Sequence, residues 1–257
     1  MEPVTASISL KFMEEINFSQ FFHQYSKRFY NLIPRDSSLW PEEWKTTYYK
    51  TYPRLPKVKL SHQDKKFDLF EAIKKRSSKR EMAGGDIGLS ELSILLKYSC
   101  GITRKTRDGD GRRAQPSGGA RFPLETYCLI VKPGEGLGPG LFHYDIKNHL
   151  LDTLWKKEFK KDELNQIANY EFVKDSSLII FLTAVFWRTQ NKYGERGYRF
   201  ILQESGHIGQ NIHLICEALG LKCCALGGFR ISDGEIERLL DIDGIAESLV
   251  YTLVVGK

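Results

Sequence analysis

Residues 177–219 read SLIIFLTAVFWRTQNKYGERGYRFILQESGHIGQNIHLICEAL, and this stretch decides the fold. Its first nine residues, 177–185, form a nearly continuous apolar run, which is the pattern of a strand buried on both faces. Residues 198–219 repeat apolar side chains at helical spacing, and Gly220 follows as a typical helix terminator. The stretch therefore predicts a central strand that leads into one long helix.

Further expected helices and strands alternate on both sides of this stretch. A Gly-rich turn at 133–140 joins two expected strands into a hairpin. Ser90 is the expected cap of the second helix. We expect one α+β domain with a mixed β-sheet flanked by helices, and not a doubly wound parallel sheet. The expected helices cover residues 63–75, 89–96, 161–170 and 233–240, and the expected strands cover 126–131, 141–144, 223–226 and 248–255.

The first 60 residues differ from the rest of the chain. They combine a short expected helix opening at residue 18 with many aromatic residues and with prolines at 41, 53 and 56. This composition favours an extended arm lying on the body over a separate domain. We expect an N-terminal arm at 1–60 and one domain at 61–257, a length that can bury a core without disulfides.

Composition and charge restrict which partners and which cellular compartment we expect for this protein. No apolar run is long enough to span a membrane, and the N-terminus lacks the basic start and apolar block of a signal peptide. Five cysteines, an odd number, fit a reducing cytoplasm. Lysine and arginine (38) exceed aspartate and glutamate (32), a net charge of +6. So small an excess permits an anionic ligand, but no basic stripe with interleaved aromatics indicates nucleic acid.

Three segments could bind an anionic or flat ligand, although each has an ordinary structural explanation as well. Residues 76–80 (RSSKR) offer paired arginines and two hydroxyls for a phosphate, or simply form a solvated helix end. Residues 112–119 (RRAQPSGG) let the backbone approach a flat ligand, or form a surface loop. Residues 226–229 (LGGF) follow a strand, but they are no Gly-x-Gly-x-x-Gly fingerprint.

Two further features lie in the deciding stretch. Lys192 and Tyr193 fall in an expected loop at a strand end, where a proton acceptor and donor are often placed. Gly206 and Gly209 cost helix stability, so we expect a close-packed partner such as another helix there. Glu204, His207 and Asn211 share a helix face as an expected polar row. No metal site is expected, because His207 and His213 lie on different helix faces and no His-Glu-x-x-His pattern occurs.

Taken in order, these segments resemble the nitroreductase-like flavoproteins, and more narrowly the SagB-type dehydrogenases, which include azoline oxidases. The resemblance covers about residues 60–257 and rests on the segments 76–80, 116–125, 138–145 and 196–211. It implies bound FMN and an interlocked homodimer with flavin at the interface. It also implies cofactor-binding roles for Arg76, Ser77, Ser78, Arg80, Pro116, Ser117, Gly118, Gln166, Leu226, Gly227 and Gly228.

In this resemblance, residues 116–118 belong to the flavin site of the second subunit. Lys192 and Tyr193 match the Lys-Tyr pair of azoline oxidation, with Lys192 as base and Tyr193 assisting. The implied substrate is a thiazoline or oxazoline ring in a ribosomally made precursor peptide, with a cyclodehydratase complex as a possible partner. Two alternatives stay open: an NAD(P)H-dependent nitroreductase or quinone reductase, and a non-catalytic scaffold of a peptide-modifying complex.

Overall fold

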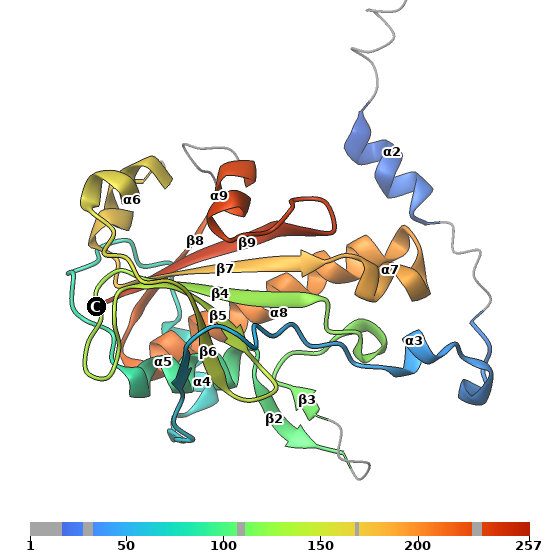
Figure 1. Cartoon of the computed structure of the whole chain (residues 1–257), viewed down its shortest axis with the longest axis horizontal. Helices are drawn as coiled ribbons and strands as arrows, with labels where there is room; N and C mark the ends of the chain where they lie inside the picture. The colour runs from blue at the N-terminus through green and yellow to red at the C-terminus, as the bar shows by residue number, and fades with distance from the viewer. Residues whose placement is uncertain (1–16, 28–32, 107–110, 168–169, 228–232) are drawn as a thin grey trace, which may run out of the picture.

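The computed structural model describes residues 17–27, 33–106, 111–167, 170–227 and 233–257. A seven-stranded sheet crosses the molecule in the order β1-β6-β5-β4-β7-β9-β8, with helices on both faces (Figure 1). A separate two-stranded hairpin pairs β2 with β3. The strands are β1 Lys57–Lys59, β2 Ile102–Lys105, β3 Gly111–Arg113, β4 Leu124–Ile130, β5 Gly140–Asp145, β6 Leu150–Trp155, β7 Leu178–Val185, β8 Lys222–Leu226 and β9 Glu247–Gly256.

The predicted central strand is confirmed as β7, which pairs with β4 on one side and β9 on the other. Seven of its eight residues are buried, because the sheet covers its edges and helices cover its faces. The predicted hairpin is confirmed as β4 and β5. The arm adds β1 to the far edge of the sheet, beside the unpredicted strand β6.

The prediction of a mixed sheet was wrong: every described strand pair of the seven-stranded sheet is antiparallel. β7 and β8 do run in the same direction, as a strand–helix–strand unit requires. However, β9 is inserted between them and pairs with both in the opposite direction. The sequence pattern predicted the strand, the long helix and the strand after it, whereas the last strand of the chain decided the pairing.

Helices cover the two faces unequally. α8, of 24 residues, packs with α5 against one face, where Ile201, Ile208 and Ile212 join the larger apolar cluster. Gly220 ends α8 in the left-handed conformation at φ 73°, as predicted. The helices are α2 Phe18–Tyr25, α3 Glu42–Lys45, α4 Leu69–Lys75, α5 Leu89–Ser99, α6 Lys161–Ile167, α7 Trp187–Tyr193, α8 Arg196–Leu219 and α9 Asp233–Leu239, with short 3-10 turns η1 Ser37–Leu39, η2 Gly118–Ala120 and η3 Glu171–Asp175.

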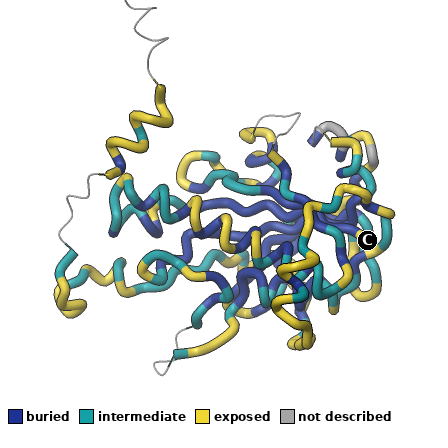
Figure 2. Tube along the Cα trace, turned by 180° about the vertical axis from the view of Figure 1, so that it is seen from behind, coloured by how far each residue is buried: buried dark blue, intermediate teal, exposed yellow. Residues whose placement is uncertain are grey.

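On the opposite face, α6, η3 and α9 cover one part of the sheet with a second apolar cluster that includes Leu164, Val173 and Ile236. The arm lies over much of the remainder, which carries polar side chains. Figure 2 shows the strands buried in the middle of the molecule and α2 exposed at its periphery. The arm therefore covers part of the sheet that the helices of this face leave open. The domain boundary at residue 60 stays a prediction.

Several local predictions need correction. The helix expected at 63–75 begins only at Leu69, because Asp68 accepts a hydrogen bond from the amide of Glu71 and caps it. Gly88, not Ser90, is the N-cap of α5, and Glu91 bonds its amide. The expected loop that holds Lys192 is helix α7.

The longest helix of the described residues is α8, with 24 residues. Neither it nor any other described helix combines the length and the apolar character that crossing a bilayer demands.

Candidate functional site

Two of the predicted cofactor segments lie side by side at the edge strand β8. The backbone amide of Lys79 donates a hydrogen bond to the carbonyl of Cys223 (2.9 Å), and the Arg80 guanidinium lies against the Cys224 thiol. Lys79 also forms a 2.6 Å ion pair with Glu217 near the end of α8. The structure thus brings residues 76–80 close to the strand that ends at Leu226.

Apart from Lys79, the side chains of residues 76–80 are accessible to a ligand. Ser77, Ser78 and Arg80 are exposed and Arg76 is half-buried. Among the described residues, no hydrogen bond within the chain occupies either hydroxyl. A Cβ at Gly227 would meet nothing within 4 Å, so open space lies over the end of β8. We refer to residues 76–80 with Leu226 and Gly227 as the β8-edge group.

The predicted cofactor residue Gln166 lies on a different element from the β8-edge group. It lies on α6, the helix whose Leu164 and Ile167 pack in the second apolar cluster. Gly228 lies outside the described residues.

The predicted loop segment Pro116–Gly118 leads into strained backbone. Gly119, Ala120 and Phe122 all adopt positive φ angles, of 63°, 55° and 48°, which is uncommon for alanine and phenylalanine. Ser117 Oγ stabilises this turn by accepting a hydrogen bond from the amide of Phe122 (2.8 Å). Such strain is often found where a backbone is shaped for a ligand.

Tyr193 lies directly against this loop. A Cβ on Gly119 would come so close to the Tyr193 hydroxyl that only glycine fits there. The tyrosine ring also meets Phe200 of α8 edge to face, with centroids 5.1 Å apart. Burial raises the pKa of Tyr193, while the positive charge of Arg121 opposes that rise.

Lys192 is 2% exposed and points toward the arm. Its Nζ lies 3.4 Å from the ring centroid of Trp40 and 5.6 Å from that of Trp44. Burial, helped by the positive charge of Arg121, lowers the pKa of Lys192. We refer to Pro116–Gly119 with Lys192 and Tyr193 as the α7 group.

Arg121 ties this group to the arm. Its buried guanidinium donates to the carbonyl of Arg188 (2.8 Å) and to three arm carbonyls, those of Glu43 (2.6 Å), Trp44 (2.8 Å) and Thr46 (3.2 Å). The sequence indicated only that Arg121 is part of a family-like segment. Its role in holding the arm depends on contacts more than 60 residues apart in the chain.

Beneath the loop, Gln115 donates a 3.1 Å hydrogen bond to the buried carboxyl of Glu204 on α8. Burial raises the pKa of Glu204 to about 7, against the lowering effects of Ser117, Gln115 and Arg113. The expected polar row does not form, because His207 is exposed and Asn211 bonds the carbonyl of Ser99 instead.

The two groups lie toward opposite ends of α8. Glu217 binds the β8-edge group, and Phe200 contacts the α7 group. These contacts are 17 residues apart on one helix, which corresponds to about 26 Å at 1.5 Å per residue. One chain therefore does not place both groups around the same small molecule.

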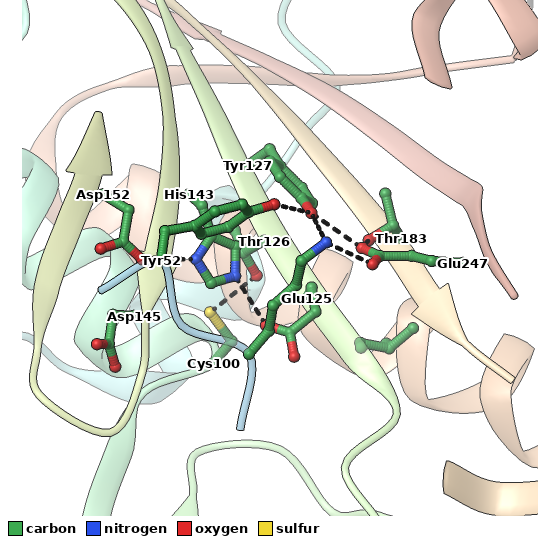
Figure 3. A network of polar contacts seen from close by, with 12 residues as sticks. Tyr52, Cys100, Glu125, Thr126, Tyr127, His143, Asp145, Asp152, Thr183 and Glu247 are labelled. Carbon is green, nitrogen blue, oxygen red and sulfur yellow. Dashed lines mark hydrogen bonds and ion pairs between the residues drawn. The ribbon is translucent and has the colours of Figure 1, made fainter. Parts of the chain in front are cut away.

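A buried polar network lies under the arm (Figure 3). His143 bridges Glu125 (3.0 Å) and Asp152 (3.1 Å), and Arg188 pairs with Glu125 at 2.5 Å. Burial alone would raise the pKa of Glu125, but Arg188, His143 and Arg113 hold it at about 2. Lys50 reaches Tyr127 and Glu247 in the same network. Because Arg188 belongs to α7, its ion pair with Glu125 connects this helix to the network.

The chain belongs to the nitroreductase family: the family model described as "Nitroreductase family" matches residues 73–257. Protein MJ1384 of Methanocaldococcus jannaschii, a nitroreductase by name, is 31% identical over 174 residues, which are 68% of this chain and 84% of that relative.

Two other relatives are processing proteins by name. The trifolitoxin-processing protein TfxB of Rhizobium leguminosarum bv. trifolii is 29% identical over 67% of this chain and 48% of its own length. The microcin B17-processing protein McbC of Escherichia coli is 28% identical over 52% of this chain and 50% of its own length. The matches span only about half of these two relatives.

Solved structures confirm the nitroreductase fold. A nitroreductase by name from Anabaena variabilis superposes with a TM-score of 0.67 at 25% identity, covering 92% of this chain and 45% of that one. The Escherichia coli microcin synthetase McbBCD complex with truncated pro-MccB17 bound contains a chain with a TM-score of 0.60 at 18% identity, covering 93% and 91%. A relative from Desulfovibrio desulfuricans, solved in complex with FMN, has a TM-score of 0.50 at 17% identity, covering 74% and 86%.

Proposed function

We propose that this protein is an FMN-dependent dehydrogenase that oxidises azoline rings of a ribosomally made peptide to azoles. The observation that carries the proposal is the buried Lys192 next to the half-buried Tyr193, whose ring lies against the loop Pro116–Gly119. A reducing cytoplasm is the proposed compartment, and all five cysteines are free and buried.

The β8-edge group fits an FMN phosphate. A dianion matches two guanidinium groups and two hydroxyls, and arginine binds phosphate with paired donors. Arg76, Ser77, Ser78 and Arg80 are half-buried or exposed beside the open space over Gly227. The FMN-bound relative of this fold supports the choice of cofactor.

The proposed assembly is a homodimer, which would bring together the two groups that lie apart along α8 of one chain. In a two-fold dimer, the α7 group of one subunit can meet the β8-edge group of its partner. Exposed apolar side chains support such a contact: Leu69 is 58% exposed, Phe70 79%, Ile73 52% and Leu202 42%. Gly206, one helical turn from the exposed Leu202 and Gln203 on α8, also faces open space.

In the proposed reaction, the cofactor and the protein side chains would each accept one of the two hydrogens that the azoline loses. Bound FMN would accept the hydride, since flavins carry this redox chemistry themselves. Lys192 would take the ring proton of the azoline, so that the two hydrogens lost by the ring are accounted for. A lowered pKa leaves more of the amine neutral and suits this task. Tyr193, kept protonated by its raised pKa, would donate a hydrogen bond to the ring.

The names of TfxB and McbC support a peptide substrate, and the microcin synthetase complex supports a cyclodehydratase partner. These are proposals for this chain, because its matches span about half of each processing relative.

The test is purification followed by a visible spectrum and two assays. We expect bound flavin and a mass loss of two hydrogens from an azoline peptide. Lys192→Ala and Tyr193→Phe should keep flavin and dimer but lose about 10²–10⁴ in rate. Full activity of both flavin-loaded variants would show that these residues are not the catalysts. A colourless parent that takes up no added FMN would instead favour the non-catalytic scaffold of a peptide-modifying complex.

A nitroreductase fed by NAD(P)H is the second candidate, because MJ1384, the relative with 84% coverage, is a nitroreductase by name. Nitro reduction needs no base that removes a carbon-bound proton. Turnover of nitroaromatics that survives Lys192→Ala, without any azoline oxidation by the parent, would favour this function.

A further inference from the structure

The ammonium of Lys192 has aromatic neighbours where an ion-pair partner would be expected. Within the described part of the chain, no carboxylate lies at ion-pair distance from Nζ. Instead, Nζ is 3.4 Å from the Trp40 ring centroid, and Trp44 and Tyr193 lie 5.6 Å and 5.7 Å away. A buried cation placed over an indole face gains a cation–π attraction, which is strongest where water is excluded.

Both indole rings are held in place by specific hydrogen bonds. Trp44 Nε1 donates to the carbonyl of Asn191 (3.1 Å), the residue immediately before Lys192. Trp40 Nε1 donates to the carbonyl of Pro34 (2.7 Å), and the two rings meet edge to face at 6.4 Å. Because Arg121 also clamps the Trp44 carbonyl, the position of the ring pair is coupled to the α7 group.

A cavity of about 480 Å³ lies beside the two tryptophans. Trp40 and Trp44 line it together with Gly119 and Arg121, whereas Lys192 is not among its lining residues. The two rings therefore contact both the lysine and the cavity. The cavity lies beside the strained loop of the α7 group, where a substrate for Lys192 would have to approach.

We propose that Trp40 and Trp44 of the arm are positioning residues for Lys192: their rings hold its ammonium and set how readily it releases its proton. The proposal rests on the proposed role of Lys192 as the base. The arm then forms a wall of the active site and does more than cover the sheet.

The charges around Lys192 are few. Arg121 faces it from the loop after η2, and Tyr193 is the titratable neighbour on its own helix. Lys45, Asp36 and Arg112 line the cavity beside the rings. Burial and Arg121 favour the neutral amine, whereas the indole quadrupoles favour the ammonium. Removing a ring while keeping the site apolar should therefore make Lys192 lose its proton at lower pH.

The test is an NMR titration of the FMN-loaded protein with isotope-labelled lysine, in which Lys192→Arg identifies the Lys192 signal. In Trp40→Leu, which keeps an apolar side chain, the titration midpoint should fall by about one pH unit, and Trp40→Phe should lie between. The acid limb of azoline oxidation should move the same way. Trp187→Leu is the matched control, because this exposed tryptophan begins the same helix and meets Tyr48 edge to face, away from Lys192.

An unchanged or raised midpoint in Trp40→Leu would overturn the inference. The titration needs no substrate, so the two proposals can fail separately. A shifted midpoint in a protein that never oxidises azolines keeps the ring contact and rejects the function. If azoline oxidation depends on Lys192 but keeps the parent's pH profile in Trp40→Leu, the proposed function stands and the positioning role of the rings is rejected.

Discussion

Lys50 Nζ of the arm lies 2.6 Å from Glu247 Oε2 at the start of β9, across 197 positions of sequence. The same ammonium donates to the Tyr127 hydroxyl at 2.7 Å. Burial disfavours the charged lysine, but the carboxylate of Glu247 outweighs this effect, so the pKa of Lys50 is raised. This contact fastens the arm to the polar part of the sheet.

Lys50→Ala should therefore destabilise the protein by roughly 1–3 kcal/mol, because it leaves a largely buried carboxylate without its charge partner. Urea unfolding measures the loss, and limited proteolysis should detect a loosened arm. Lys75→Ala is the control: its pair with Glu71 is exposed and should change stability by less than about 0.5 kcal/mol. Equal effects of the two variants would mean that the Lys50 contact does not hold the arm.

Glu204 should make stability depend on pH. Its pKa is raised from 4.5 to about 7 in the fold, so the native state keeps a proton that the unfolded state loses above pH 4.5. Stability from this group is complete below about pH 4.5 and falls until pH 7, by roughly 3 kcal/mol. Glu204→Gln should match the parent near pH 4 and exceed its stability at pH 8. Parallel unfolding curves of parent and variant between these pH values would contradict the buried acid.

Gly206 provides a test of the dimer. A side chain at Gly206 meets nothing within 4 Å in its own chain, so Gly206→Arg should fold and yet disrupt a partner surface on α8. We expect monomers in sedimentation and a loss of bound FMN, because association and cofactor binding are linked. Gly138→Arg adds the same charge at another open position and should stay dimeric. If Gly206→Arg stays dimeric and keeps its flavin, this face of α8 is not the dimer interface.

Gly209, three residues further on, has a different reason to be glycine. A Cβ there would lie 2.4 Å from the ring of Tyr251 on β9, so the close neighbour is a strand of the same chain and not another helix. The expected close packing at Gly209 is confirmed, but the partner is a strand and not the helix that was given as the example.

Arg76→Ala should weaken FMN binding about 10–150-fold, the loss of one charged hydrogen bond of about 1.5–3 kcal/mol. Flavin fluorescence titration of the apoprotein measures it. Lys74→Ala removes a positive charge from an exposed position of the same helix end and should change affinity little. The phosphate role of Arg76 does not hold if both variants bind FMN like the parent.

Local sequence patterns determined much of this fold. The apolar run at β7, the helical spacing of α8 and its glycine terminator were all predictable, because strand and helix periods record which side of an element is buried. The segments of the candidate site were predictable for another reason: their residue types and order resemble those of a family, even where their surroundings were unknown.

Only the tertiary structure decided how these pieces meet. β9 enters between β7 and β8 and makes the sheet antiparallel, and α8 separates the two candidate ligand-binding groups by about 26 Å. Trp40 reaches Lys192 from the arm, and Trp44 bonds Asn191 from 147 positions away. Such contacts depend on the path of the whole chain and on burial that several elements create together. The neighbours of a residue in the sequence determine neither the path of the chain nor this burial. The chemistry of Lys192 could therefore be proposed from the sequence, whereas its surroundings could not.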